Sequence, residues 1–456
     1  MHWKSGNNMI KRKIDSYIRD YYASTSNALL ITGARQIGKT FSIREFGKTF
    51  KSFVEINFVE RPDAVGVFKE ARGVDDILLR LSTVTSAPLI KGDTLVFFDE
   101  VQLCPEIVTA IKFLVDEGSY RYILSGSLLG VELKDLRSEP VGYMGVKDMY
   151  PLDFEEFVSA VGVGEKVIGA LRDAWEKRIA VDAFVHTKMM ELYRLYLIVG
   201  GMPAAVSKYL ESNNLQEVMT VQQDVIRLYK RDIAQYDPHN KLYIEEIFNL
   251  IPPELDAKNK RFILKRLNEH AKFDRFQNSF LWLANAGVAL PVYNVEEPKV
   301  PLLLAKTRNL FKLFQSDIGL LAAQYAQGIQ LRIIKGDKDI NHGAIYENAV
   351  AQELVAHGLS VYYYNSKKRG ELDFVIELDG RIIPIEVKSG KDYDTHRALS
   401  NIMDCGEYNI AEAVVFNNDN LHVKGKIVYA PIYMAMFIEK NDTAPTYYKV
   451  DLSGIR

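Results

Sequence analysis

The sequence predicts an α/β protein of more than one domain. A parallel sheet is expected at its N-terminal end, a mostly helical part in the middle and a smaller α/β unit at its C-terminal end. Three observations predict this. The 456-residue chain is too long for one ordinary domain, and with 48% hydrophobic residues it can form sizeable cores. Short apolar runs alternate with helical patterns between residues 27 and 130, and a second such alternation begins at Gly343.

Strands and helices alternate regularly in the N-terminal unit. Four short apolar runs predict buried strands at Ala28–Thr32, Phe53–Phe58, Thr94–Phe98 and Tyr120–Leu124. Helical patterns lie between them at Lys39–Phe46, Val74–Leu81 and Pro105–Val115. Nearly continuous apolar strands separated by helices indicate a parallel sheet that is covered on both faces.

The middle of the chain, from Pro151 to about Leu290, is mostly helical in pattern. Helical spacing is found at Leu192–Ile198, Leu215–Tyr229 and Ile244–Ile251. The segment Lys258–Leu290 predicts a helix, a break and a second helix, and an apolar strand follows at Leu290–Val295. That order is similar to a winged helix-turn-helix, and an ordinary helical lid is the alternative.

A bridging segment is expected from Lys306 to Asp339, before the second α/β unit. In that unit a helix is predicted at Ala344–His357 and another around Thr395–Met403. Strands are predicted at Ser360–Tyr364, Leu372–Leu378, Ile382–Val387, Ala413–Phe416 and Lys426–Tyr429.

Charge and cysteine content limit the possible classes of protein. The formal net charge is -2, so no overall basic field indicates nucleic acid, although a local basic patch remains possible. Two cysteines without a CxxC pair argue against structural zinc and suit a reducing compartment. No apolar run approaches the roughly 20 residues of a membrane helix. We expect a cytoplasmic protein that does not bind a membrane.

A phosphate-binding loop is the strongest motif in the sequence. The segment GARQIGKT, Gly33 to Thr40, fits G-x-x-x-x-G-K-[ST] and lies between a predicted strand and a predicted helix. Its glycines allow a tight loop whose N–H groups surround phosphate oxygens. Lys39 would reach the β- and γ-phosphates, and the Thr40 hydroxyl would bind Mg²⁺. A fortuitous glycine-rich turn is the alternative.

The segment TLVFFDEVQ supplies the second half of this site. Asp99 follows an apolar strand and could hold the Mg²⁺ shell, and Glu100 could orient or deprotonate the attacking water. A third strand ends near Ser125, whose hydroxyl could sense the γ-phosphate; an ordinary turn is the alternative. The predicted nucleotide-binding residues are Gly33, Ala34, Arg35, Gln36, Ile37, Gly38, Lys39, Thr40, Phe41, Asp99 and Ser125.

Hydrolysis also requires positive charge on the transferring phosphoryl group. Arg137, on a loop after the third strand, is one candidate for that charge. A solvated surface arginine is the alternative, and the charge could instead come from another subunit.

A second chemical constellation lies near the C-terminus. Asp373 precedes a turn at Asp379-Gly380, and the next strand carries Glu386 and Lys388. Residues two apart on a strand face the same side, so Glu386 and Lys388 project together, and the hairpin can bring Asp373 beside them. Two carboxylates and a lysine suit a Mg²⁺-dependent nuclease that cuts phosphodiesters.

Glu347, on the preceding helix, could complete the metal shell of this site, which would comprise Glu347, Asp373 and Glu386. Lys388 would position or polarise the water that attacks the phosphodiester. The alternative is a surface pair, because strands with alternating Glu and Lys are common on solvated faces. Against that alternative, apolar residues alternate strictly with the charged ones here, and Pro384 interrupts the polar face.

With these motifs the chain resembles the prokaryotic AAA-type ATPases that carry a C-terminal restriction-endonuclease-like domain of otherwise unknown function. The resemblance spans nearly the whole chain. Its motifs are LLITGARQIGKT, FFDEVQ, LSGS, YPLDFEEF, GGMP, YKRDI, KLFQSDIGLL, YEN and IPIEVKSG.

The resemblance implies three parts and a bridge. It implies a P-loop (AAA-like) ATPase core over residues 1–205 and a helical lid or winged-helix-like region over 206–300. A bridging segment over 301–342 leads to a nuclease-like domain of the PD-(D/E)xK type over 343–456. ATP and Mg²⁺ are the implied cofactors.

One position departs from the family. The family usually has a Gly-Arg pair shortly before its PLSF-like motif, and Tyr143 stands here where the arginine is expected. If that arginine senses the γ-phosphate, hydrolysis here is slow or uses another residue. The nuclease-like positions show no such departure.

Three hypotheses follow for the function. The first is an ATPase that couples its nucleotide state to a C-terminal nuclease acting on DNA. The second is a nucleotide-dependent switch or scaffold, whose catalytically silent C-terminal domain binds a protein or nucleic acid. The third is a DNA-binding regulator that acts through the basic run of Lys258–Leu290, for which a solvated helical face is the alternative. The oligomeric state stays open.

Overall fold

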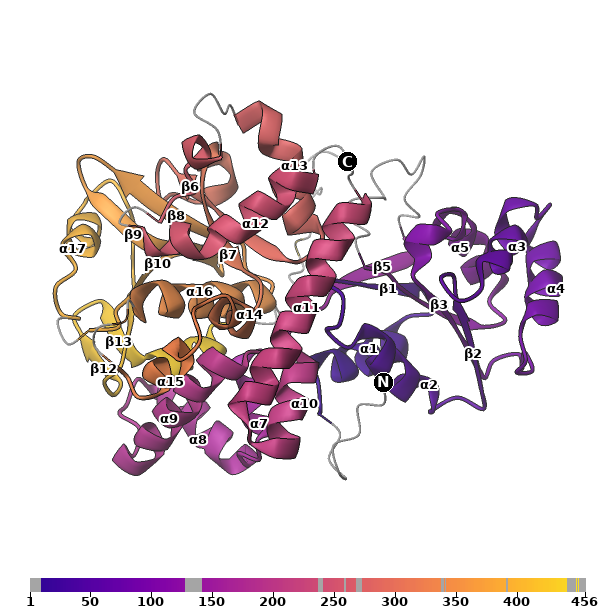
Figure 1. The fold of residues 1–456 in the computed structure, drawn as a ribbon, viewed down its shortest axis with the longest axis horizontal. Coiled ribbons are helices and arrows are strands. Elements are labelled where there is room, and N and C mark those ends of the chain that lie inside the picture. Colours follow the sequence, from indigo (N-terminus) through magenta and orange to yellow (C-terminus); the bar gives the residue numbers. More distant parts are fainter. Residues whose placement is uncertain are drawn as a thin grey trace.

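The structure is a computed structural model that describes residues 10–127, 142–236, 241–257, 260–267, 273–337, 340, 342–390, 393–440, 448 and 450. It contains a five-stranded sheet and an eight-stranded sheet. Figure 1 shows the two sheets at opposite ends of the molecule, with the long helix α11 (Leu215–Tyr236) running between them.

The first sheet is entirely parallel and has the strand order β2-β3-β4-β1-β5. Its strands are β1 (Ala28–Thr32), β2 (Ser52–Asn57), β3 (Thr94–Asp99), β4 (Arg121–Ser125) and β5 (Met144–Asp148). The four predicted strands are therefore confirmed within one or two residues. β5 was missed because it is an edge strand whose side chains stay largely exposed, so its sequence contains no apolar run.

Both faces of this sheet are covered, as its continuous apolar strands predict. Along β1, Leu29 and Ile31 enter one apolar core, and Ala28 and Leu30 enter another on the opposite face. The surrounding helices are α1 (Lys13–Ser24), α2 (Lys39–Gly47), α3 (Gly66–Lys69), α4 (Val74–Val84) and α5 (Glu106–Glu117).

The middle of the chain is helical, as expected. Its helices are α7 (Phe154–Ala160), α8 (Glu165–Lys177), α9 (Ala183–Val199), α10 (Pro203–Ser212), α11, α12 (Lys241–Asp256) and α13 (Phe273–Asn285). α13 leads directly into an antiparallel hairpin, and α12 and α13 pack together. None of the described helices combines the length and the apolar character that a membrane crossing requires.

The second sheet is mixed, with the order β12-β13-β11-β10-β9-β8-β6-β7. Its strands are β6 (Ala289–Val295), β7 (Lys306–Gln315), β8 (Val361–Ser366), β9 (Gly370–Leu378), β10 (Arg381–Val387), β11 (Ala413–Asn417), β12 (His422–Lys424) and β13 (Ile427–Pro431). The segment from Lys306 to Asp339, expected as a bridge, thus contributes a ten-residue strand. The domain boundaries drawn from the sequence remain a prediction.

Helices cover both faces of this second sheet. α16 (His342–Ala356) contacts β6, β7, β8 and β10, and α17 (Arg397–Met403) packs on β9. The short helices α14 (Ile318–Ala323) and α15 (Ile329–Ile334) connect β7 to α16 and pack on α9. One apolar core extends from Leu29 in the first sheet to Phe374 in the second.

Candidate functional site

The predicted phosphate loop connects β1 to α2 and has the backbone that its glycines permit. Gly33 has φ +133°, and a Cβ placed there would lie 2.2 Å from the carbonyl oxygen of Met149. Gly38, with φ +100°, precedes the first turn of α2. The N–H groups at the start of α2 are therefore available to an anion at this end of the sheet.

Lys39 is turned back onto its own loop. Its Nζ donates to the carbonyl oxygens of Gly33, at 2.9 Å, and Ala34, at 2.8 Å. Burial lowers the pKa of Lys39 to about 8, and the negative charges of Glu100 and Asp99 offset part of that effect. The Lys39 ammonium thus forms hydrogen bonds with carbonyl groups of its own loop.

Asp99 sits at the carboxyl end of β3 and contacts the residue predicted to share Mg²⁺ with it. The Thr40 hydroxyl donates to Asp99 Oδ2 at 3.2 Å, and the Ser125 hydroxyl donates to Oδ1. The Asn57 amide also donates to Oδ2, at 3.0 Å. Burial raises the pKa of Asp99, against the hydrogen bond from Ser125. The side-chain oxygens of Thr40 and Ser125 thus lie within hydrogen-bond distance of the Asp99 carboxylate, and oxygen is the ligand type that a hard cation prefers.

Glu100 is held by side chains from two neighbouring segments. Its Oε2 accepts from Gln102 Nε2 at 2.6 Å and from the Ser127 hydroxyl at 3.0 Å. Its backbone is left-handed, with φ 57° and ψ 46°, which is an uncommon conformation for a residue with a side chain. Strained residues of this kind concentrate at functional sites.

Arg35, inside the phosphate loop, joins the site to the middle of the chain. Its Nε donates to Ser127 Oγ at 3.2 Å, and its Nη1 lies 2.5 Å from Oδ1 of Asp232 on α11. Tyr229, one turn earlier on α11, donates its hydroxyl to the Arg35 carbonyl at 3.1 Å.

A continuous polar path therefore runs from the predicted Mg²⁺ ligands to α11. It passes through Thr40, Asp99, Glu100, Ser127, Arg35 and Asp232.

The remaining loop residues pack against neighbouring parts of the chain. Ala34 and Ile37 are buried, and Arg12 donates to the Ile37 carbonyl at 2.9 Å. At Gly287, in the turn after α13, a Cβ would lie 2.9 Å from the Ala34 nitrogen. Gln36 is exposed, and Phe41 is half-buried. The helical region is thus in direct contact with the phosphate loop.

The candidate sources of an arginine differ in position. Arg137 lies outside the described residues. Tyr143 precedes β5, at the end of the sheet where Ala28 pairs with Met144, whereas the phosphate loop follows Thr32 at the opposite end. Its ring contacts Lys112 Nζ at 5.2 Å. Position 143 therefore lies at the end of the sheet opposite to the loop of its own chain, whereas Arg35 donates to Ser127, which in turn contacts Glu100.

The C-terminal carboxylates are also brought together, but they are buried. Asp373 Oδ2 accepts the Val387 N–H at 2.9 Å, across the β9–β10 pair. Glu386 is 3% exposed, and its Oε2 lies 3.1 Å from Lys388 Nζ. The surface-pair alternative assumed a solvated face, and the burial of Glu386 argues against it.

Two lysines that the sequence reading missed neutralise Glu347. Lys312, 0% exposed on β7, lies 3.6 Å from Glu347 and 2.8 Å from Glu371. Lys260 forms a further ion pair with Glu347. The carboxylates of Glu347, Asp373 and Glu386 do not form a group whose ligand atoms all lie within 4.8 Å among the described residues.

The three carboxyl groups of this cluster differ in the direction of their pKa shifts. Burial raises the pKa of Glu386, and the nearby Asp373 raises it further. For Asp373, burial acts in the same direction, but Lys312 and Lys260 outweigh it and its pKa is lowered. Burial raises the pKa of Glu347, with Asp373 adding to it and Lys312 opposing it. The negative charge of the three carboxylates is thus partly compensated by neighbouring lysines.

Several residues of the two sites carried some sequence signal. Asn57 ends a strand beside β3, and polar side chains at the carboxyl ends of parallel strands converge. Lys312 interrupts an apolar run, which is an unusual place for a charge. The pairing of Asp232 with Arg35 gave no local signal, because the two residues are 197 positions apart in the chain.

Comparisons with known families match three separate parts of the chain. Residues 25–158 match the AAA domain, which identifies the first sheet as a P-loop domain of the AAA type. Residues 190–331 match a domain of unknown function, DUF8612, and residues 342–434 match another, DUF4143. No curated protein matches the chain.

Two solved structures resemble the chain distantly. One is a Walker-type ATPase of Pyrococcus abyssi, 14% identical, with a TM-score of 0.42, covering 69% of this chain and 96% of its own. The other is the S. cerevisiae Hsp104–ADP complex, 12% identical, with a TM-score of 0.25, covering 77% of this chain and 43% of its own.

Proposed function

We propose, from the premise that residues 25–158 are a P-loop domain of the AAA type, that the chain binds and hydrolyses ATP and transmits its nucleotide state through α11 to the C-terminal unit. The polar path from Thr40 to Asp232 carries this proposal, because it joins the phosphate site to α11 through hydrogen bonds, one of them from the Glu100 backbone N–H. In this proposal phosphate oxygens compete with the loop carbonyls for Lys39 and with Asp232 for Arg35.

Each residue has a physical role in this proposal. Lys39 leaves the Gly33 and Ala34 carbonyls to pair with phosphate, and the α2 N-terminus supplies N–H donors. Thr40 and Asp99 would hold Mg²⁺, which when bound neutralises charge on the phosphates. Glu100 would accept a proton from the attacking water or orient it, and Ser127 and Gln102 fix its carboxylate.

Arg35 would provide the charge on the phosphoryl group within the same chain. To do so it must exchange its contact with Asp232 for one with a phosphate oxygen. That exchange removes one contact between α11 and the loop. A phosphate group and the Asp232 carboxylate of α11 therefore compete for the guanidinium of Arg35. Nucleotide binding and the position of α11 become linked through this competition.

The experiment for this part is nucleotide binding and hydrolysis by the purified full chain. Replacing Lys39 with Ala should abolish ATP binding and hydrolysis. Lys48, exposed on the C-terminal side of α2 and paired with Glu45, offers a matched Lys→Ala control that should retain both activities. Normal ATP hydrolysis by the Lys39 variant would reject the assignment of the loop.

For the C-terminal unit, the first candidate is a Mg²⁺-dependent nuclease acting on DNA, with Asp373, Glu386 and Lys388 at its site. The adjacent positions of these side chains across β9 and β10 support it. Carboxylates would hold the metal and Lys388 would polarise the water.

The second candidate is a silent unit that binds a protein or nucleic acid without cutting. The ion pairs of Glu347 with Lys260 and Lys312 favour it, because lysine ammonium groups already supply the positive charge that a metal would bring.

Cleavage of linear, circular and single-stranded DNA separates the two candidates. The reaction is run with Mg²⁺ or Mn²⁺, with and without ATP, beside Asp373→Ala and Glu386→Ala. Cutting that both substitutions abolish supports the nuclease, and its dependence on ATP measures the coupling. No cutting under any of these conditions supports the silent unit.

A further inference from the structure

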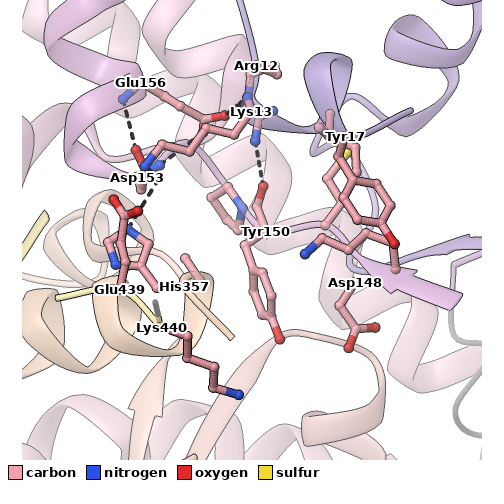
Figure 2. Close-up of a pocket in the computed structure, with 15 residues that line it drawn as sticks. Arg12, Lys13, Tyr17, Asp148, Tyr150, Asp153, Glu156, His357, Glu439 and Lys440 are labelled. Atoms are coloured by element: carbon pink, nitrogen blue, oxygen red, sulfur yellow. Dashed lines mark hydrogen bonds and ion pairs between the residues drawn. The ribbon is translucent and has the colours of Figure 1, made fainter. Parts of the chain in front are cut away.

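A further group of metal-ligating side chains lies between the start of α7 and the end of α16. Asp153 is the N-cap of α7, whereas Glu353 lies in the last turn of α16 and His357 follows directly after that helix. One ligand atom from each can be chosen so that all three lie within 4.8 Å of one another, and the described residues contain no other such group of three. Figure 2 shows Asp153 and His357 facing each other, with Lys13 beside them.

His357 has an imidazole nitrogen without a hydrogen-bond partner. Its Nδ1 lies 2.9 Å from the Ile438 carbonyl oxygen, which can only accept, so Nδ1 carries a proton. The side chain is 4% exposed, and Nε2 makes no hydrogen bond. Buried polar atoms normally have a partner, so an unpaired one in a native protein requires an explanation.

An ion pair explains this nitrogen poorly. Nε2 lies 3.5 Å from Asp153 Oδ2 and 3.7 Å from Glu353 Oε1, whereas charge-assisted N–H···O bonds span about 2.7–2.9 Å. Moreover, Lys13 already gives Asp153 a cation, with Nζ 2.8 Å from Oδ2. Nε2 therefore lies between two carboxylate oxygens, and these three atoms together can supply the ligands of one metal ion.

Backbone groups orient both carboxylates toward this point. Asp153 Oδ1 accepts the Glu156 N–H at 2.8 Å, which leaves Oδ2 facing His357. Both oxygens of Glu353 accept the Phe154 N–H, Oε2 at 3.1 Å and Oε1 at 3.3 Å, and Oε1 is also 3.7 Å from His357 Nε2. Hydrogen bonds of this kind orient the side chains that bind a metal ion, and the Ile438 carbonyl orients the imidazole of His357 in the same way.

We propose that Asp153, Glu353 and His357 bind one divalent transition-metal ion of the zinc class. One imidazole nitrogen and two carboxylate oxygens suit Zn²⁺ and its neighbours, whereas Mg²⁺ and Ca²⁺ prefer oxygen ligands alone. A pocket of about 310 Å³ lies alongside and is lined by Asp153, His357 and Lys13, which leaves room for a water ligand.

Lys13 is the competitor of the metal in this proposal. Its Nζ contacts Asp153 at 2.8 Å and Glu155 at 2.7 Å, but its side chain is 43% exposed. The ammonium can therefore turn toward solvent and release Asp153 when an ion arrives. The bound ion would tie α7, within the AAA-type domain, to α16 of the C-terminal unit.

Titration of the full chain with Co²⁺, without nucleotide and near neutral pH, tests the site. Co²⁺ reports its ligands through its visible absorption, and Zn²⁺ should displace it. We expect one equivalent to bind with a nitrogen-ligated spectrum. His357→Ala and the nearly isosteric Glu353→Gln should each weaken binding at least about tenfold, and circular dichroism checks that both variants are folded.

Two further variants make the result specific. Glu211→Ala, at an exposed carboxylate of α10 that pairs with Lys208, should bind Co²⁺ as the original chain does. Lys13→Met should tighten binding, a gain that a misfolded variant cannot produce. The proposal is overturned if the original chain binds no Co²⁺, if His357→Ala leaves affinity and spectrum unchanged, or if Lys13→Met weakens binding.

Discussion

The guanidinium of Arg35 in the phosphate loop lies 2.5 Å from the carboxylate of Asp232 on α11. Asp232 is 8% exposed on its side chain, and Arg35 is 31% exposed, so solvent screens this pair only partly. The pair joins the AAA-type domain to the helix that lies between the two sheets (Figure 1).

Replacing Asp232 with Asn should therefore tighten ATP binding, because Arg35 no longer has to leave a carboxylate to meet phosphate. A partly buried pair of this kind contributes about 1 kcal/mol, which corresponds to roughly fivefold in Kd. Calorimetric titration with a non-hydrolysable ATP analogue measures the change. Asp224→Asn is the matched control, since Asp224 pairs with Arg227 on the exposed side of the same helix. Weaker binding by the Asp232 variant would contradict the competition.

ATP affinity should fall as pH rises above about 8. Burial lowers the pKa of Lys39 to about 8, so its ammonium is charged below that pH and becomes neutral above it. A neutral amine cannot offset phosphate charge, and the loss can reach about tenfold for each further pH unit. Kd measured across this range tests the sign. A Lys39→Arg variant keeps its charge, so its profile should be flatter, and a flat profile in the original chain would exclude this role for Lys39.

Replacing Glu100 with Gln should abolish most ATP hydrolysis and leave ATP binding nearly unchanged. The amide cannot accept a proton from water, and the loss of a positioned general base costs about 10²- to 10⁴-fold in kcat. Steady-state phosphate release and analogue binding separate the two quantities. Glu70→Gln, at a side chain that is 76% exposed, controls for the change of charge. Unchanged turnover in the Glu100 variant would remove Glu100 from the reaction.

Two Gly→Ala substitutions should change stability in opposite directions. At Gly201 a Cβ would lie 2.1 Å from the Leu152 carbonyl oxygen, so the backbone must move, at a cost on the order of 3 kcal/mol. Gly169 lies exposed in α8 with no atom near its Cβ position, so Ala there should add about 0.5–1 kcal/mol. Urea unfolding of both variants measures the difference, and equal midpoints would contradict the packing at Gly201.

The phosphate loop could be predicted because one contiguous segment determines it. Strand, glycines, lysine and threonine follow each other along the chain, and the structure places them as the motif implies. Asp99 could be predicted because an apolar strand ends there. The pairing of Asp232 with Arg35 and of Lys312 with Glu347 could not be predicted, since ion pairs between segments far apart in the chain leave no local pattern.

The C-terminal site was predicted as a set of residues but not in its environment. Alternating charges on β10 suggested a face open to metal and solvent, whereas residues on both faces of β10 are buried. The strand β7, with Lys312, comes from the segment expected as a bridge, and it brings the charge that neutralises Glu347. Local sequence patterns reveal the direction in which a side chain points, but not what later covers it.

The order of strands in the second sheet has a consequence for how the chain is made. β6 pairs with β7 at once, but its other edge pairs with β8, which leaves the ribosome only after α14, α15 and α16. Until then that edge presents unpaired N–H and C=O groups beside an apolar surface. During synthesis a chaperone or a neighbouring polypeptide can therefore bind to the unpaired edge of β6. This stage ends when β8 has left the ribosome and pairs with β6.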